Sequence, residues 1–199
     1  MTVKLTSVAL LFICYLTSCK ETNEQLINKG IRLSDERKYD EAIAIYTDVI
    51  KRNPKLPLAY YNRGIAYMYL EKYKNALADF NKIIASQQNS GPFKYVPNPN
   101  SPFAKEEDRA FVSYYEALYQ RAQVKYHMDS VQSSYRDFTE LIENYYEVSN
   151  CYLWQGTLWM RAGNREKACE RFDKATIYAR TEEDRQEADR MTKEYCAAK

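Results

Sequence analysis

Residues 60–80 read YYNRGIAYMYLEKYKNALADF, and this stretch decides the fold. The same pattern of small and aromatic residues also occurs 34 residues earlier in the chain. The second copy consists of Gly64, Tyr73, Ala76 and Phe80, and the first of Gly30, Tyr39, Ala42 and Tyr46. A fixed period of this length indicates a repeat architecture, in which each unit packs against its neighbours.

The pattern continues beyond an interruption. Tyr119-Gln-Arg-Ala-Gln matches Tyr61-Asn-Arg-Gly-Ile at an offset of 58 residues, which is one period plus 24 extra residues. A proline-rich stretch, with Pro92, Pro97, Pro99 and Pro102, supplies the extra length. The pattern positions are then Ala122, Val131, Ser134 and Phe138, followed 34 residues later by Gly156, Arg165, Ala168 and Phe172. The chain therefore contains four repeats.

A 34-residue period with this order of residues resembles the tetratricopeptide repeat (TPR), over about residues 23–179. The resemblance implies an all-α protein: a right-handed α-solenoid of about four helix pairs, closed by a C-terminal capping helix. We expect repeats 1 and 2 over 25–86, a proline-rich insertion over 87–107, repeats 3 and 4 over 108–180, and the cap over 181–199.

Small residues on both helices of a pair are expected to let the two backbones approach, as for Gly64 with Ala76 and Gly156 with Ala168. The third repeat departs from the pattern most. Ala122 and Ser134 replace the glycine and the alanine, and Lys125 stands where the other repeats have Leu33, Tyr67 and Trp159.

The first residues resemble the signal of a bacterial lipoprotein. Residues 5–16 are mostly apolar and too short to span a bilayer, and Leu16-Thr17-Ser18-Cys19 resembles a lipobox. This predicts a signal peptide over 1–18, acylation of Cys19, a lipidated tether over 19–24, and an envelope protein at the outer membrane. Lys20 and Glu21 resemble a Bacteroidetes surface-export signal, but a plain tether looks the same, so the surface and the periplasmic side both remain open.

Composition disfavours several function classes. Lys+Arg 29 against Asp+Glu 27 gives a nearly neutral chain without dense basic runs, so nucleic acid is not an expected partner. The single histidine, His127, supports neither a metal site nor a catalytic triad, and no phosphate-binding glycine motif is present. We therefore expect no enzyme, catalytic residue, metal or cofactor.

Three thiols remain after signal removal and acylation: Cys151, Cys169 and Cys196. At least one of them is unpaired within the monomer. Three buried, free cysteines are the preferred interpretation. The alternative is a disulfide, which would join Cys169 to Cys196 if the cap packs on the last repeat.

The first helices of the pairs are expected to line a partner-binding groove. Its predicted residues are Tyr61, Ile65, Met68, Tyr69, Tyr119, Gln123, Tyr126, Leu153 and Met160, with Ile27 and Ile31 in the first repeat. Some family members hold a peptide's terminal carboxylate with Lys and Asn on these helices. Ile27 and Ile31 stand at two of those positions, so an apolar or extended segment is the expected ligand instead.

The leading hypothesis is a lipid-anchored scaffold or assembly factor that binds a protein or peptide. The alternative is a surface accessory protein that binds a glycan or another nutrient, with its tyrosines stacked on sugar rings. The insertion, with Phe93, Tyr95 and Phe103, either fills the groove or contacts the partner.

Overall fold

The computed structural model describes residues 21–87 and 112–197, which form helices and contain no strand within those ranges. The helices are α2 (Asn23–Asp35), α3 (Tyr39–Arg52), α4 (Pro57–Tyr69), α5 (Tyr73–Gln87), α7 (Tyr114–His127), α8 (Val131–Glu143), α9 (Val148–Arg161), α10 (Arg165–Tyr178) and α11 (Glu182–Cys196). They make four pairs and a final helix, so the predicted all-α fold of four helix pairs plus a cap is confirmed.

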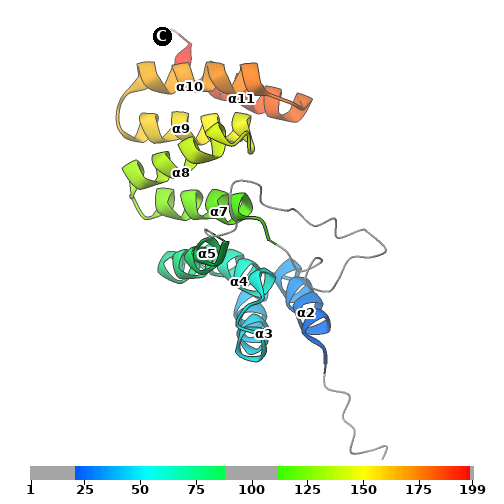
Figure 1. Cartoon of the computed structure of the whole chain (residues 1–199). Coiled ribbons are helices and arrows are strands. Elements are labelled where there is room, and N and C mark those ends of the chain that lie inside the picture. The colour runs from blue at the N-terminus through cyan, green and yellow to red at the C-terminus, as the bar shows by residue number, and fades with distance from the viewer. Residues whose placement is uncertain (1–20, 88–111, 198–199) are drawn as a thin grey trace, which may run out of the picture.

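The helices follow one another along an elongated array (Figure 1). Each helix packs chiefly on its neighbours in the sequence, as α3 does on α2 and α4. First helices of successive pairs also touch, α2 with α4 and α4 with α7. One face of the array is therefore built from first helices, and the pockets between them lie where two repeats meet.

Within each pair, the small residue of the first helix makes room for an aromatic ring of the second. A Cβ placed on Gly64 would lie 2.8 Å from Cζ of Phe80, and one on Gly156 would lie 2.2 Å from Cε1 of Phe172. Gly30 has the same relation to Tyr46. The expectation that these glycines admit the partner helix's backbone therefore needs correction, because the group they admit is the ring sixteen residues later.

The turn between the two helices of each pair is built in the same way four times. Its second residue has a positive φ, at Arg37 (61°), Glu71 (55°), Asp129 (56°) and Gly163 (75°). The next backbone N–H reaches back to close the turn, as Lys38 N does to Leu33 O at 2.8 Å and Asn164 N to Trp159 O at 2.9 Å. This left-handed helix cap favours glycine, yet only the fourth repeat has one.

The two central pairs each bury an ion pair. Arg63 donates two hydrogen bonds to Asp79, at 2.9 and 2.7 Å, and Arg121 donates two to Asp137, at 2.8 and 2.9 Å. Lys125 also reaches Asp137, at 2.7 Å. The lysine that departed from the repeat pattern thus has a partner within its own repeat.

Polar bonds at one repeated position join successive pairs. Arg63 donates to Thr47 of α3 at 3.1 Å, and Arg121 donates to Asn81 of α5 at 3.2 Å. In the fourth pair Gln155 stands in place of the arginine and donates to Thr139 of α8 at 2.9 Å. One position on each of α4, α7 and α9 therefore fixes that helix to the pair before it.

The repeat array is continuous across the insertion. Helix α5 packs on α7, and the buried Gln87 donates to the backbone carbonyl of Val112 at 2.6 Å. The predicted insertion therefore lies outside the described residues except for Gln87, as do the signal peptide and Cys19. In the described ranges, no helix combines the length and apolar character that membrane spanning needs.

Candidate functional site

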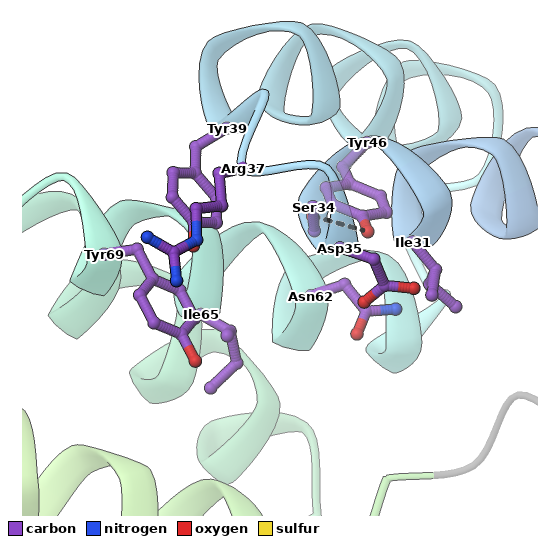
Figure 2. Close-up of a pocket in the computed structure, with 9 residues that line it drawn as sticks. All are labelled: Ile31, Ser34, Asp35, Arg37, Tyr39, Tyr46, Asn62, Ile65 and Tyr69. Atoms are coloured by element: carbon purple, nitrogen blue, oxygen red, sulfur yellow. Dashed lines mark hydrogen bonds between the residues drawn. The ribbon is translucent and has the colours of Figure 1, made fainter.

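A pocket of about 670 Å³ opens between the first and second helix pairs (Figure 2). Helix α2 and the turn after it form one side, and α4 forms the other. Its lining consists of Ile31, Ser34, Asp35, Arg37, Tyr39, Tyr46, Asn62, Ile65 and Tyr69. Of the predicted groove, only Ile31, Ile65 and Tyr69 lie in this pocket.

A stacked pair of rings forms one wall. The rings of Tyr39 and Tyr69 lie nearly parallel, with centroids 4.8 Å apart, and Tyr69 is 66% exposed. Tyr73 and His127 repeat this contact at the next junction, with centroids 5.1 Å apart. The first residue of a second helix thus stacks on the last residue of the following first helix, and this holds the Tyr69 ring in place at the pocket mouth.

The floor of the pocket carries polar groups among apolar ones. The hydroxyls of Ser34 and Tyr46 lie 3.4 Å apart, and burial raises the pKa of the Tyr46 phenol above its ordinary value. Nδ2 of Asn62 is buried and has no hydrogen-bond partner among the described residues. A buried donor without an acceptor is costly, so a ligand carbonyl that reached this nitrogen would be stabilising.

Two charges border the pocket, one of each sign. Asp35 and Arg37 are both exposed, and neither takes part in an ion pair within the described ranges. The remaining lining is neutral. This arrangement suits an uncharged or internally balanced segment better than a free terminal carboxylate, which would require a concentration of positive charge.

The predicted groove residues Tyr61 and Tyr119 pack between repeats. Tyr61 meets Phe80 edge-on, and its hydroxyl accepts a hydrogen bond from Gln120 at 3.4 Å. Tyr119 meets Phe138 in the same way and accepts from Trp154 Nε1 at 3.2 Å. Burial raises the pKa of Tyr119 to about 12. Both rings stabilise repeat junctions and present little free surface.

The other predicted groove residues also serve packing. Tyr126 contacts Trp154 edge-on and lies beneath the Arg161 guanidinium, 4.1 Å from the ring centre. Leu153 is buried, so it does not line an open surface. Met68 and Met160 pack against core clusters, Gln123 is half-buried, and Ile27 is buried on α2.

Sequence reasoning missed the polar half of the pocket, namely Ser34, Asp35, Arg37 and Asn62. A usable signal was present for one of them. Gly163 marks a left-handed turn in the fourth repeat, and its equivalent in the first repeat is Arg37. The turn geometry is what places Arg37 beside Tyr39 at the pocket mouth (Figure 2).

The cysteines also differ from the preferred interpretation. A disulfide joins Cys169 to Cys196, with Cα atoms 5.7 Å apart, and Cys151 is free and buried. The interpretation of three free thiols is therefore wrong, because α11 packs on α10 and brings the two sulfurs together. Within the described ranges no group of three or more His, Cys, Asp or Glu is placed to hold a metal ion.

Known proteins with a similar sequence include tetratricopeptide-repeat proteins. The tetratricopeptide-repeat family model matches residues 57–90. Hsp70-Hsp90 organizing protein 2 of Arabidopsis thaliana is 36% identical over 90 residues, which are 45% of this chain and 16% of that protein. Tetratricopeptide repeat protein 36 of Caenorhabditis elegans is 37% identical over 65 residues, 33% of this chain and 36% of its own length. The chain thus spans only a minor part of these relatives.

Among solved structures, MamA from Desulfovibrio magneticus RS-1 is similar with a TM-score of 0.62 and 18% identity, over 79% of this chain and 76% of its own. That similarity concerns the fold. The family match concerns the second helix pair and the start of the insertion. The chain therefore contains a tetratricopeptide-repeat match at residues 57–90 and has the helix-pair fold of tetratricopeptide-repeat structures.

Proposed function

We propose that this chain is a protein-interaction scaffold whose pocket between repeats 1 and 2 receives an extended, largely uncharged segment of a partner. The observation that carries the proposal is the pocket itself: the apolar side chains of Ile31 and Ile65 and the ring of Tyr69 line the same pocket as the buried amide nitrogen of Asn62. A peptide supplies both complements, an apolar side chain and a backbone carbonyl.

The repeat architecture supports this reading, since helix-pair arrays present extended surfaces to partners. Two curated relatives are named as organizing proteins for Hsp70 and Hsp90. Their partners do not transfer to this chain, because Ile27 is buried and Ile31 is apolar where charged or amide side chains would be needed. The partner is therefore expected to be bound through an internal apolar segment.

Photocrosslinking in cells tests the pocket directly. Benzoylphenylalanine in place of Ile65 is expected to crosslink a defined protein. The same group in place of Ala44, an exposed residue of α3 outside the pocket, is the matched control and is expected to give no such product. Tyr69→Ala should reduce the Ile65 crosslink at least about tenfold, the loss typical of an interface anchor. Identical products at both positions would contradict a partner in this pocket.

A glycan is the second candidate, favoured by one observation. The Tyr69 ring is held with an exposed face in a pocket that also contains the polar groups of Asp35, Arg37 and Asn62, which suits a sugar with its hydroxyls. Titration with oligosaccharides, read by the fluorescence and melting temperature of the chain, separates the two. Saturable stabilisation that Tyr69→Ala abolishes, without any protein crosslink, would favour the glycan.

We further propose that acylated Cys19 holds the scaffold at a bacterial outer membrane. Leu16-Thr17-Ser18-Cys19 supports this proposal, and the several acyl chains of a lipoprotein would give nearly permanent attachment. Mass spectrometry of the N-terminal peptide is expected to show acyl groups on Cys19. Cys19→Ala should leave the chain unprocessed or released. An unmodified Cys19 in the mature chain would exclude the lipid anchor without affecting the pocket.

A further inference from the structure

Helix α11 covers the end of the array in the way that each first helix covers the pair before it. It packs on α10 and also touches α9. Ala188 is buried in a cluster with Leu153 and Phe172, and Met191 and Tyr195 pack at the edge of that cluster. Helix α11 thus stands where a fifth pair would begin, and no second helix follows it within the described residues.

The buried apolar contact of α11 is small. Ala188 is its only buried residue, whereas α7 buries five residues and α9 buries seven. Most of the other residues of α11 are charged and exposed. Since burial of apolar surface supplies most of the stability of helix packing, α11 gains much less from docking than the helices inside the array.

Buried polar atoms without a hydrogen-bond partner are concentrated in this region. Within the described ranges, four buried side-chain nitrogen or oxygen atoms have no hydrogen-bond partner, and three lie on the last three helices. They are Trp159 Nε1 on α9, Arg171 Nε on α10 and Thr192 Oγ1 on α11. A buried polar group without a partner is costly, and the Thr192 hydroxyl, which α11 itself carries, would regain water if the helix were released.

A covalent bond fastens the far end of α11. Cys196, its last residue, is joined to Cys169 of α10, and both residues are half-buried. Arg165 supports the same end, donating to the carbonyls of Tyr195 at 2.6 Å and Ala197 at 2.7 Å. At the other end, three residues connect α10 to α11. The disulfide therefore joins residues 27 apart in the sequence and keeps a weakly packed helix in place.

We infer that the face beneath α11 is a helix-binding surface, which α11 occupies in the disulfide-bonded chain and vacates on reduction. A dithiol reductant supplies the electrons. One of its thiolates attacks a sulfur of the Cys169–Cys196 bond and forms a mixed disulfide, and its second thiol then displaces the protein sulfur. The protein bond is broken, the reductant's own disulfide is formed, and two protons complete the two cysteine thiols.

The surface selects an amphipathic helix of the kind that α11 represents. In the array, a glycine on a first helix is followed three residues later by a bulky side chain, as Gly64 is by Tyr67 and Gly156 by Trp159. Ala188 and Met191 have the same spacing on α11. A partner helix is therefore expected to place a small residue against Phe172 and an apolar residue one turn further, with charged residues on its outer face.

Hydrogen exchange of the full chain, measured before and after addition of dithiothreitol, tests the release. Protection of 182–196 is expected to fall at least about tenfold on reduction, while α4 and α7 keep theirs. Cys196→Ser should show the low protection without any reductant. Cys151→Ser is the matched control, because that thiol is free and takes no part in the bond. Unchanged protection of 182–196 after complete reduction would overturn the inference.

A synthetic peptide of residues 181–197, labelled with fluorescein and carrying Cys196→Ser, tests the acceptor face. It is expected to bind the reduced full chain at least about ten times more tightly than the oxidised chain, because α11 competes more strongly when the disulfide fastens both of its ends than when only residues 179–181 hold it. The same peptide with Ala188→Glu should not bind. Equal binding to both redox forms, or no binding to the reduced chain, would overturn the inference. Neither result bears on the pocket between repeats 1 and 2.

Discussion

The second and third repeats bury the same ion pair, but they surround it differently. In repeat 2 the ring of Tyr67 lies near Arg63, with the guanidinium 5.8 Å from the ring centre. In repeat 3 the equivalent residue is Lys125, which adds a second cation to Asp137. This position therefore accepts different side chains when each one complements the arginine–aspartate pair.

Removing the shared aspartate is expected to have the largest effect and to distinguish the repeats. Asp137→Asn leaves two mostly buried cations, Arg121 and Lys125, without their carboxylate, at an expected cost of about 3–5 kcal/mol. Asp79→Asn, which strands one cation beside an aromatic ring, should cost less. Urea denaturation followed by circular dichroism measures both.

A rescue variant isolates the contribution of Lys125. Lys125→Tyr restores the arrangement of repeat 2 and should recover part of the loss in the Asp137→Asn background, because it removes one of the stranded charges. Equal unfolding free energies for the two aspartate variants would show that Lys125 adds no electrostatic dependence.

The two repeats also differ in the small residue of the first helix, which is Gly64 in repeat 2 and Ala122 in repeat 3. In repeat 2 a Cβ on Gly64 would lie too close to Phe80, whereas repeat 3 holds Ala122 beside Phe138 and adds a bond from Ser134 Oγ to Ala122 O at 2.7 Å. Gly64→Ala is therefore expected to destabilise by about 1–3 kcal/mol through overpacking.

The matched variant, Ala122→Gly, should cost about 1 kcal/mol from loss of helix propensity. Thermal denaturation measures both changes. Stabilisation by Gly64→Ala would mean that helix propensity outweighs the contact with the Phe80 ring.

The turns are expected to give the smallest effect, with a sign opposite to the others. Glu71 and Asp129 have positive φ, so Glu71→Gly should stabilise by up to about 1 kcal/mol. Asp129→Gly should gain less, because aspartate tolerates this conformation better and Asp129 also pairs with Arg161 at 3.0 Å. Gly163→Ala, made as a control, should destabilise. A larger gain at Asp129 than at Glu71 in differential scanning calorimetry would contradict this ranking.

The period in the sequence was sufficient to predict the helix pairs and their number, because small and aromatic residues recur in register. It was not sufficient to predict that Tyr61 packs between repeats whereas Tyr69 lines a pocket. The two residues lie two helical turns apart on one face of α4. Gln120 of α7 covers the first, while the second projects past the turn of repeat 1. That outcome depends on how far neighbouring helices overlap along their axes, which the spacing within one helix does not encode.

The polar residues of the site could not be predicted from the sequence for a related reason. In the sequence, Lys125 departs from the repeat pattern without a visible reason. In the structure it forms an ion pair with Asp137, twelve residues later. Asn62 belongs to the same short motif as Arg63, and nothing in its spacing distinguishes a pocket amide from a solvated one. Charge partners and pocket floors are formed by residues from different helices, so they are visible only when the pairs are assembled.

The hydrogen bond from Gln87 to Val112 lies at the junction of two helices that are far apart in the sequence, and this distance affects the order of folding. Among the described helices, other successive ones are separated by three or four residues, whereas α5 and α7 are separated by 26. By length alone, closing that connection costs about 1.5–2 kcal/mol more entropy than closing a short one. Each half of the array can form through local contacts first, and the two halves then join at the α5–α7 junction. Joining of the two halves at the α5–α7 junction should therefore be the refolding step with the highest entropic barrier. The native packing of α5 on α7 is nevertheless no weaker than that between other successive helix pairs.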